Sequence, residues 1–440
     1  MKVIINLGIL LLAPFWLGAQ SVADAYVLEA MTNNKALLQK QNLVAQKRSE
    51  VSQAQGLFAP QLSFQANYTL AYGGRELNFP VGDMLNPAYA ALNELTESNQ
   101  FPTDIENVEE QFLPHNFQET KLRLIQPIFN SDLYYNLKAR QNLLSLEQAR
   151  VEAYELELAY TVKTAYYQYL QSEEGIKVYE SNMASLKALL ETNRKLVKEG
   201  QQSPEAVYRT QVAINHLKAD WQAAVESRDR ARNYFNFLLN RPLSKAITID
   251  SNVNSGTLAP DTNISQRPEL KALEAARLAQ ANEVNRLSAQ RLPNLNLVVD
   301  AGFQGFGYEF DEQEFLLMQV GLQWNIFSGF SRRSQQATAN LQLENLQLQE
   351  AELLQQLRLQ VAQAWVQLES AQAQMSAQQA ATENARKNLE IAQKKYAQGQ
   401  ILLLELLDAQ NSYQAEQQAL LISTYRIPMA VAAIERATAL

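Results

Sequence analysis

The stretch Ala59–Gly74, APQLSFQANYTLAYGG, decides how this sequence folds. Apolar side chains occupy every second position from Leu62 to Tyr72, and polar side chains occupy the alternate positions from Gln61 to Thr69. A period of two is typical of a β-strand with one apolar face and one polar face. Most of the remaining sequence has the pattern of long helices. The strand must therefore be explained within a mostly helical protein.

The composition excludes several classes of function. The 440 residues carry 38 Lys and Arg against 46 Asp and Glu, a net charge of −8, with no basic cluster, so nucleic acid is not expected as a partner. The absence of Cys excludes disulfides, thiolate metal sites and a lipidated N-terminal Cys. The two histidines, His115 and His216, lie far apart in the sequence. We predict no cofactor and no metal site.

The N-terminal sequence MKVIINLGILLLAPFWLGAQ has a Lys, then an apolar run, then small residues at Gly18-Ala19. This is the pattern of a secretory signal peptide over residues 1–19, cut after Ala19. A retained membrane anchor is the alternative, although the run is short for a membrane span. No later segment reaches 18 consecutive apolar residues. The sequence thus predicts an exported protein and leaves a membrane protein built from strands open.

The chain is a tandem repeat. Residues 51–64, VSQAQGLFAPQLSF, align with residues 284–297, VNRLSAQRLPNLNL, and residues 164–172 align with residues 363–371. Each copy shows the same order of helix, strand, loop, strand, very long helix, turn and helix.

We place repeat 1 at 20–245, a linker at 246–266 and repeat 2 at 267–440. The first copy is longer because of Arg75–Asn116, a segment rich in Pro, Asn and acidic residues. We expect this segment to be a long exposed loop between two strands.

Four strands can be identified from period-two patterns. They have about ten residues each, with one apolar face, one polar face and aromatic residues near their ends, which suits a barrel facing lipid. The predicted strands are 61–72, 116–129, 294–307 and 315–327.

Two very long helices are the second signal. Residues 330–398 contain neither Gly nor Pro, and residues 131–199 contain only Gly175. At 1.5 Å per residue each segment allows a helix of about 100 Å. The later segment also has a heptad seam, which indicates packing along the helix length. The seam consists of Leu354, Leu357, Val361, Ala364, Leu368, Ala371 and Met375.

Four strands are too few to close a membrane barrel, which needs at least about eight. An open sheet edge is not tolerated in lipid, because its unpaired amides find no hydrogen-bond partner there. The strands must therefore be pooled from several identical chains.

The sequence resembles the TolC-like outer-membrane efflux proteins over nearly all of the mature chain. The motifs that carry the resemblance are APQLSF and LPNLNL before strands, QPIFNSD and WNIFSGF after strands, RPEL at Arg267–Leu270, and YAQGQILLLELLDAQ at Tyr396–Gln410. The resemblance implies a mainly α fold with β, in which a homotrimer forms one 12-stranded outer-membrane β-barrel and a periplasmic helical barrel. It also implies a periplasmic adaptor and an inner-membrane pump, of the RND type or an ABC exporter, as partners.

The resemblance further implies a constriction at the helical tip. Tyr396 and Asp408 match the family motif, and Glu405 stands where Asp is usual, so three copies would form two stacked acidic rings. Ile401 replaces an Arg common in the family, so Glu205 in the first copy lacks that partner. The alternatives are that Glu405 and Asp408 are first-turn acids that favour a helix N-terminus, and that Tyr396 is a packing residue.

The two tip turns are expected near residues 200 and 399. Gly200, Gln201, Gly399 and Gln400 are candidates for contact with the adaptor, although the glycines are turn residues first.

No catalytic motif stands out. GFQGFG at 302–307 is not followed by a helix, so its glycines are interpreted as strand glycines and not as a phosphate loop. We predict a passive outer-membrane exit duct of a tripartite efflux system, extending into the periplasm, and not an enzyme. The alternatives are the outer-membrane component of a type I protein secretion system and a soluble periplasmic coiled-coil adaptor.

Overall fold

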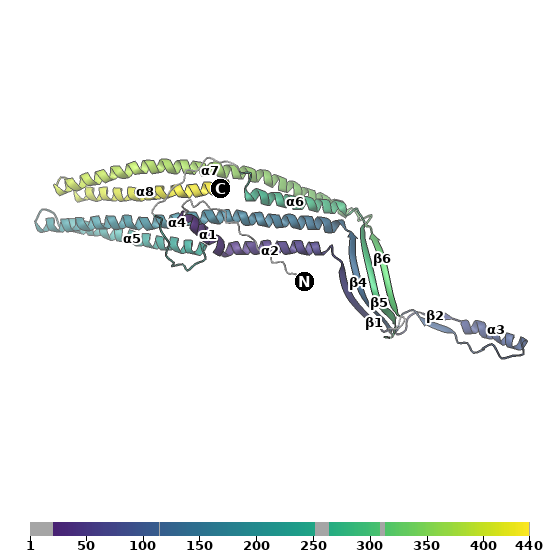
Figure 1. Ribbon diagram of the computed structural model, residues 1–440. Helices are drawn as coiled ribbons and strands as arrows, with labels where there is room; N and C mark the ends of the chain where they lie inside the picture. The colour runs from purple at the N-terminus through teal and green to yellow at the C-terminus, as the bar shows by residue number, and fades with distance from the viewer. Residues whose placement is uncertain (1–20, 114, 251–263, 309–312, 440) are drawn as a thin grey trace, which may run out of the picture. The chain divides into compact units, whose positions relative to one another are not determined.

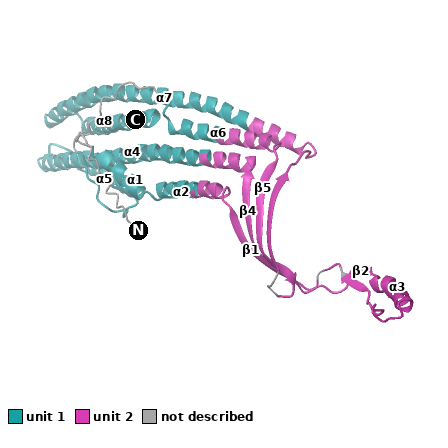
Figure 2. Ribbon diagram, turned by 45° about the vertical axis from the view of Figure 1, so that its right-hand side comes forward, with its two compact units in different colours: residues 1–48, 142–278, 343–440 teal, residues 49–141, 279–342 magenta. Residues whose placement is uncertain are grey.

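The computed structural model describes residues 21–113, 115–250, 264–308 and 313–439 (Figure 1). The predicted signal peptide lies outside the described residues, as does most of the predicted linker. The chain divides into two compact units (Figure 2). Unit 1 comprises residues 1–48, 142–278 and 343–440, and unit 2 comprises residues 49–141 and 279–342.

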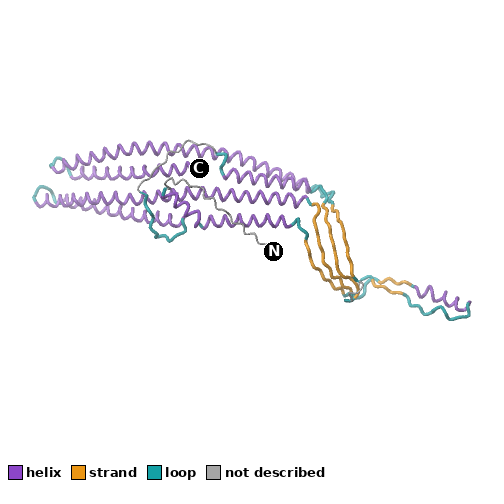
Figure 3. Tube along the Cα trace, viewed as in Figure 1, coloured by secondary structure: helices purple, strands orange, loops and turns teal. Residues whose placement is uncertain are grey.

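Helices account for most of the described chain (Figure 3). The two very long helices are confirmed, because α4 and α7 begin and end within one residue of the predicted bounds. The helices outside the β1–β4 connection are α1 (Val22–Asn33), α2 (Lys35–Gly56), α4 (Ser131–Lys198), α5 (Glu205–Leu238), α6 (Pro268–Ala289), α7 (Ser331–Ala397) and α8 (Leu403–Thr438). None of the helices within the described ranges is long and apolar enough to cross a membrane.

The predicted heptad seam of α7 is confirmed as a packing surface. Its central members from Leu357 to Ala371 are buried in one cluster with Ile427, Ala430 and Ile434 of α8. Apolar residues at alternating steps of three and four lie on one side of a helix, so α7 and α8 pack along their length.

Unit 2 contains a four-stranded antiparallel sheet in the order β1-β4-β5-β6. The strands are β1 (Gln61–Thr69), β4 (Phe117–Phe129), β5 (Asn294–Phe306) and β6 (Glu314–Gln323). The four predicted amphipathic strands are thus confirmed, with β1 and β6 ending three and four residues earlier than predicted. The strand order makes β1 and β6 the two edges of the sheet.

The register aligns the apolar positions of the four strands on one face. Phe64 lies opposite Leu122, Leu122 opposite Ala301, and Ala301 opposite Leu316. This face is open, since Phe64 is 68% exposed and Leu316 is 72% exposed.

The other face of the sheet is polar and contains an ion-pair cluster. Arg123 on β4 donates from Nε and Nη2 to the two carboxylate oxygens of Asp300 on β5, at 2.8 and 2.6 Å. Lys121 lies 3.6 Å from Asp300 and 2.6 Å from Glu119. Since carboxylates bind Arg well through two parallel hydrogen bonds, this pair ties β4 to β5 on the polar face.

The prediction of a long loop at Arg75–Asn116 is wrong. The segment contains β2 (Glu76–Phe79), α3 (Val81–Leu95) and β3 (Val108–Gln111), and β2 pairs with β3. Its Pro and Asn residues are ordinary signals of irregular structure. Here Pro80 stands at the N-terminal cap of α3, and Asn side chains bind the returning chain.

Candidate functional site

The two turns at the ends of the long helices have the same geometry. Gly200 follows α4 with φ 72°, and Gly399 follows α7 with φ 69°. In each turn the next residue, Gln201 or Gln400, donates its N–H to a carbonyl five positions earlier, at 2.8 and 2.9 Å. This is the Schellman helix ending, which needs a residue that adopts positive φ without strain. All four residues are exposed.

Tyr396 lies in the packing between the two helical hairpins. It is 4% exposed, and its O–H donates to Oδ1 of Asn193 on α4 at 2.6 Å. Asn193 in turn donates from Nδ2 to Oγ1 of Thr210 on α5 at 2.9 Å, and both residues are fully buried. Burial raises the pKa of Tyr396, more than its hydrogen bond with Asn193 lowers it. Tyr396 is therefore a neutral hydrogen-bond donor that joins α7 to α4.

Glu405 and Asp408 are exposed on the first turns of α8. Oε1 of Glu405 accepts the N–H of Leu402 at 3.4 Å, the contact of an acid that caps a helix N-terminus. Asp408 lines a groove of about 500 Å³ together with Tyr208 and Arg209 of α5. The structure thus places Asp408, but not Glu405, in the lining of this groove.

Glu205 has a partner on its own helix. Arg209 donates from Nε to Oε1 of Glu205 at 2.6 Å, and both side chains are more than half exposed. Sequence reasoning considered only a partner from position 401 and missed Arg209, which lies one turn further along α5. Arg209 also lines the groove of Asp408.

Two buried asparagines near the tip were also missed. Asn193 belongs to the network of Tyr396, and Asn182 accepts from Nε2 of Gln410 on α8 at 2.6 Å. Both asparagines lie on the same face of α4 as the buried Leu186 and Leu190. A polar residue at a seam position is a signal that the sequence contains, since such residues fix the register of packed helices.

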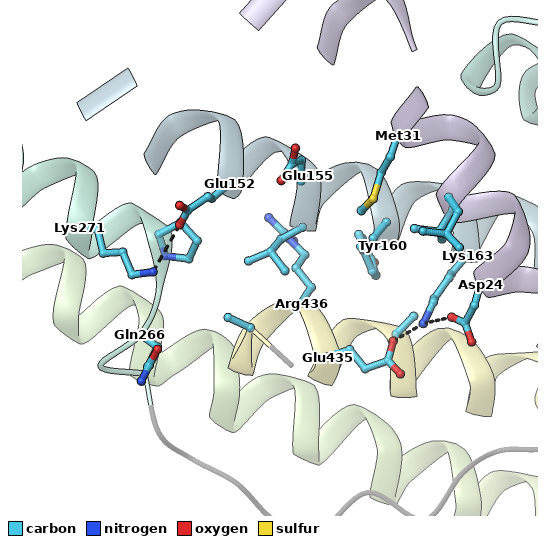
Figure 4. A pocket seen from close by; sticks show the side chains of 17 residues that line it. Asp24, Met31, Glu152, Glu155, Tyr160, Lys163, Gln266, Lys271, Glu435 and Arg436 are labelled. Carbon is cyan, nitrogen blue, oxygen red and sulfur yellow. Dashed lines mark hydrogen bonds and ion pairs between the residues drawn. The ribbon is translucent and has the colours of Figure 1, made fainter. Parts of the chain in front are cut away.

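A cavity of about 540 Å³ lies among α1, α4, α6 and α8 of unit 1 (Figure 4). Lys163 reaches from α4 between two carboxylates, Asp24 of α1 and Glu435 of α8, at 2.8 Å from each. Burial alone would lower the pKa of Lys163, but its hydrogen bonds to both acids raise it. Burial would raise the pKa of Asp24, but the bonds from Lys163 and Ser21 lower it.

This arrangement, the Lys163 latch, joins three helices from distant parts of the sequence. Because both acids are occupied by one cation, the cavity contains a structural ion-pair cluster. Among the described residues no group of three or more His, Cys, Asp or Glu side chains is placed to hold a metal ion.

Comparison with known proteins gives consistent matches. The model of the outer membrane efflux protein family matches residues 259–440. The pyoverdine export outer membrane protein OpmQ of Pseudomonas putida is 26% identical over 333 residues, which cover 69% of this chain and 67% of that protein.

Solved structures match the fold over nearly the whole chain. The outer-membrane channel OprN superposes with a TM-score of 0.79 at 16% identity, covering 95% of this chain and 89% of OprN. The outer membrane protein VceC of Vibrio cholerae gives a TM-score of 0.76 at 18% identity, covering 94% and 95% of the two chains.

Proposed function

We propose that the chain is an outer membrane efflux protein and forms the exit duct of a tripartite efflux system, since the model of that family matches residues 259–440. The duct is a passive channel that lies in the outer membrane and extends into the periplasm. The observation that carries the proposal is the sheet of unit 2, which has two edge strands and one exposed apolar face.

The sheet is suited to lipid only as part of a closed ring. Phe64, Leu316 and Val320 are each more than 60% exposed on its apolar face. The edges β1 and β6 would leave backbone amides without partners in hydrocarbon, at a cost of several kcal/mol for each group. Three copies, each placing β6 beside β1 of the next, satisfy both edges with twelve strands. The homotrimer is thus part of the proposal.

The long helix α7 offers a second contact surface for a neighbouring copy. Leu348, Leu359 and Val366 are 57–63% exposed. They are separated by eleven and seven residues, which are close to whole helical turns, so they lie in one stripe. The buried seam that includes Leu357 and Ala364 lies on the opposite side of the same helix. A helix with apolar residues on two opposite sides is suited to a ring of helices, with a neighbour on each side.

The tip is the proposed contact with the adaptor and the pump. Gly200, Gln201, Gly399 and Gln400 are exposed at the ends of two helical hairpins, where a periplasmic adaptor can bind them. The adaptor would connect the duct to an inner-membrane pump of the RND type or to an ABC exporter.

The exposed Glu405 and Asp408 would form the acidic rings of the constriction in the trimer. The same duct serves protein secretion if the exporter is a type I system, which is the second candidate function.

Bilayer recording of protein extracted from outer membranes tests the proposal. We expect a heat-modifiable oligomer that conducts ions, and a strain without the protein that accumulates a fluorescent pump substrate. A product found free in the periplasm, with no conductance, would support the coiled-coil adaptor instead. Accumulation of an unexported polypeptide, with normal efflux of small molecules, would favour protein secretion.

A further inference from the structure

The connection between β1 and β4 forms a folded extension at one end of the sheet. Thr69 and Phe117, which pair in register, are its two points of attachment. The opposite end of β4 leads into α4, so the extension lies at the sheet end away from the long helices. Residues 75–116 contain eight acidic side chains and one basic side chain, Arg75, and so hold most of the net charge of −8. Such a charge keeps the extension in water and argues against lipid as its contact.

One side of α3 is fixed by asparagine clamps. Asn86 donates from Nδ2 to the carbonyl of Ile105 at 2.8 Å and accepts the N–H of Ile105 at 2.9 Å. Asn93, two turns later, makes the same pair of bonds with Phe101, at 2.8 and 3.0 Å. Each amide side chain thus satisfies both backbone groups of a residue in the returning segment. This side of α3 therefore binds the returning segment of the same chain.

The opposite side of α3 is an exposed apolar seam. Its members are Met84, Ala88, Ala91 and Leu95, which follow each other at steps of four, three and four. Met84 is 72% exposed and Leu95 is 81% exposed. The same spacing on α7 marks the surface where that helix packs on another. The two central alanines allow a second helix to approach closely.

The flanks of this seam differ in chemistry. At 100° per residue, Asp83 and Glu94 lie beside the seam on one flank, whereas Val81 and Leu92 lie on the other. Around a threefold axis, one flank of each helix meets the unlike flank of the next. Acidic flanks therefore do not face each other, and the second copy of this chain is an acceptable partner despite the negative charge.

We propose that the α3 seams of three copies pack together as a three-helix cap over the outer end of the duct. The proposal rests on the trimer of the proposed function. That trimer brings three extensions to one end, because each is attached to its sheet at both ends. Tethering of this kind gives an effective concentration in the millimolar range, sufficient for a short seam. The cap restricts passage through the outer end until the three helices separate.

Cysteine cross-linking tests the cap, since the chain contains no Cys of its own. Ala88→Cys lies on the seam, and Ala90→Cys is the matched control, an exposed alanine about 200° around the same helix. Oxidation of membranes with copper phenanthroline should form covalent dimers of Ala88→Cys, and most of the chains that have a partner available should react. The Ala90→Cys control should give at least tenfold fewer covalent dimers. Ala91→Cys, the other seam alanine, should behave like Ala88→Cys.

The same variants test the functional consequence. Oxidised Ala88→Cys channels should conduct less in planar bilayers, and dithiothreitol should restore the conductance, whereas the control should not respond. A heat-modifiable trimer in all variants, with no cross-link at either seam position, would overturn the cap and leave the duct intact. Absence of a trimer in the unmodified protein would overturn both proposals.

Discussion

The substitution Val320→Arg tests which face of the sheet meets lipid. Val320 lies on the apolar face of β6 and is 61% exposed. Gln319, its neighbour in the same strand, points to the polar face, so Gln319→Arg adds the same charge on the other side. Leu322→Arg places the charge on the apolar face again, nearer to the strand end.

The expected magnitudes follow from the position of each residue in the strand. The ten residues of β6, at a rise of about 3.4 Å and a tilt of about 45°, span about 24 Å, close to the apolar band of about 25 Å. Val320 then lies about 4 Å from the midplane and Leu322 about 8 Å. Arg costs about 2–4 kcal/mol at the midplane and about 0–1 kcal/mol at the interface. We expect about 3 kcal/mol per chain for Val320→Arg and about 1–2 kcal/mol for Leu322→Arg.

The assay is the yield of heat-modifiable trimer in outer membranes, together with the temperature at which it converts to monomer. Three copies multiply the cost, so Val320→Arg should lose about 9 kcal/mol per trimer and nearly all assembly. Leu322→Arg should give an intermediate yield, and Gln319→Arg should stay close to the parent. Equal yields for Val320→Arg and Gln319→Arg would refute the assignment of the apolar face to lipid.

Three further predictions concern unit 1. The double variant Glu405→Gln with Asp408→Asn should reduce cation preference in reversal-potential measurements, and an unchanged ratio would make both residues simple helix-start acids. Tyr396→Phe should cost about 1–3 kcal/mol by leaving a buried amide oxygen without its donor. Thermal melting measures this loss, with Tyr413→Phe as the control, since the Tyr413 hydroxyl makes no hydrogen bond within the described part of the chain. Lys163→Met should lower the melting temperature between about pH 4 and 10 and converge with the parent outside that range. The pKa of Asp24 is lowered in the folded protein, so the stabilisation is present above pH 3.8 and is lost on acidification. The pKa of Lys163 is raised, so the stabilisation is present below pH 10.5 and is lost in alkali. A constant difference across pH would contradict the latch.

Local patterns were sufficient to predict the four strands of the larger sheet and the two longest helices. The strand β1 follows from the period-two alternation of residues 61–69, and the helix α7 follows from the absence of Gly and Pro in residues 331–397. Both patterns depend only on neighbours in the sequence, and the structure confirms the strand and the helix. The heptad seam likewise identified the packed side of α7. The stripe with Leu348 and Leu359 on the other side of α7 was not recognised, because one apolar stripe is enough to explain a helix.

Contacts between distant segments could not be predicted from one sequence. The Lys163 latch joins residues 24, 163 and 435, and no local pattern marks them as neighbours. The helix α3 was missed for a different reason. Its asparagines were interpreted as loop formers, whereas Asn86 and Asn93 bind backbone that returns from residues 101–105. An amide side chain that pairs with distant backbone has the same composition as one in a loop.

The number of chains in the membrane-extracted particle tests the central claim most directly. Native mass spectrometry of the detergent-extracted protein should give a particle of three chains, because the sheet of one chain has two edges that only further copies can pair. A stable single chain in the outer membrane would contradict the account.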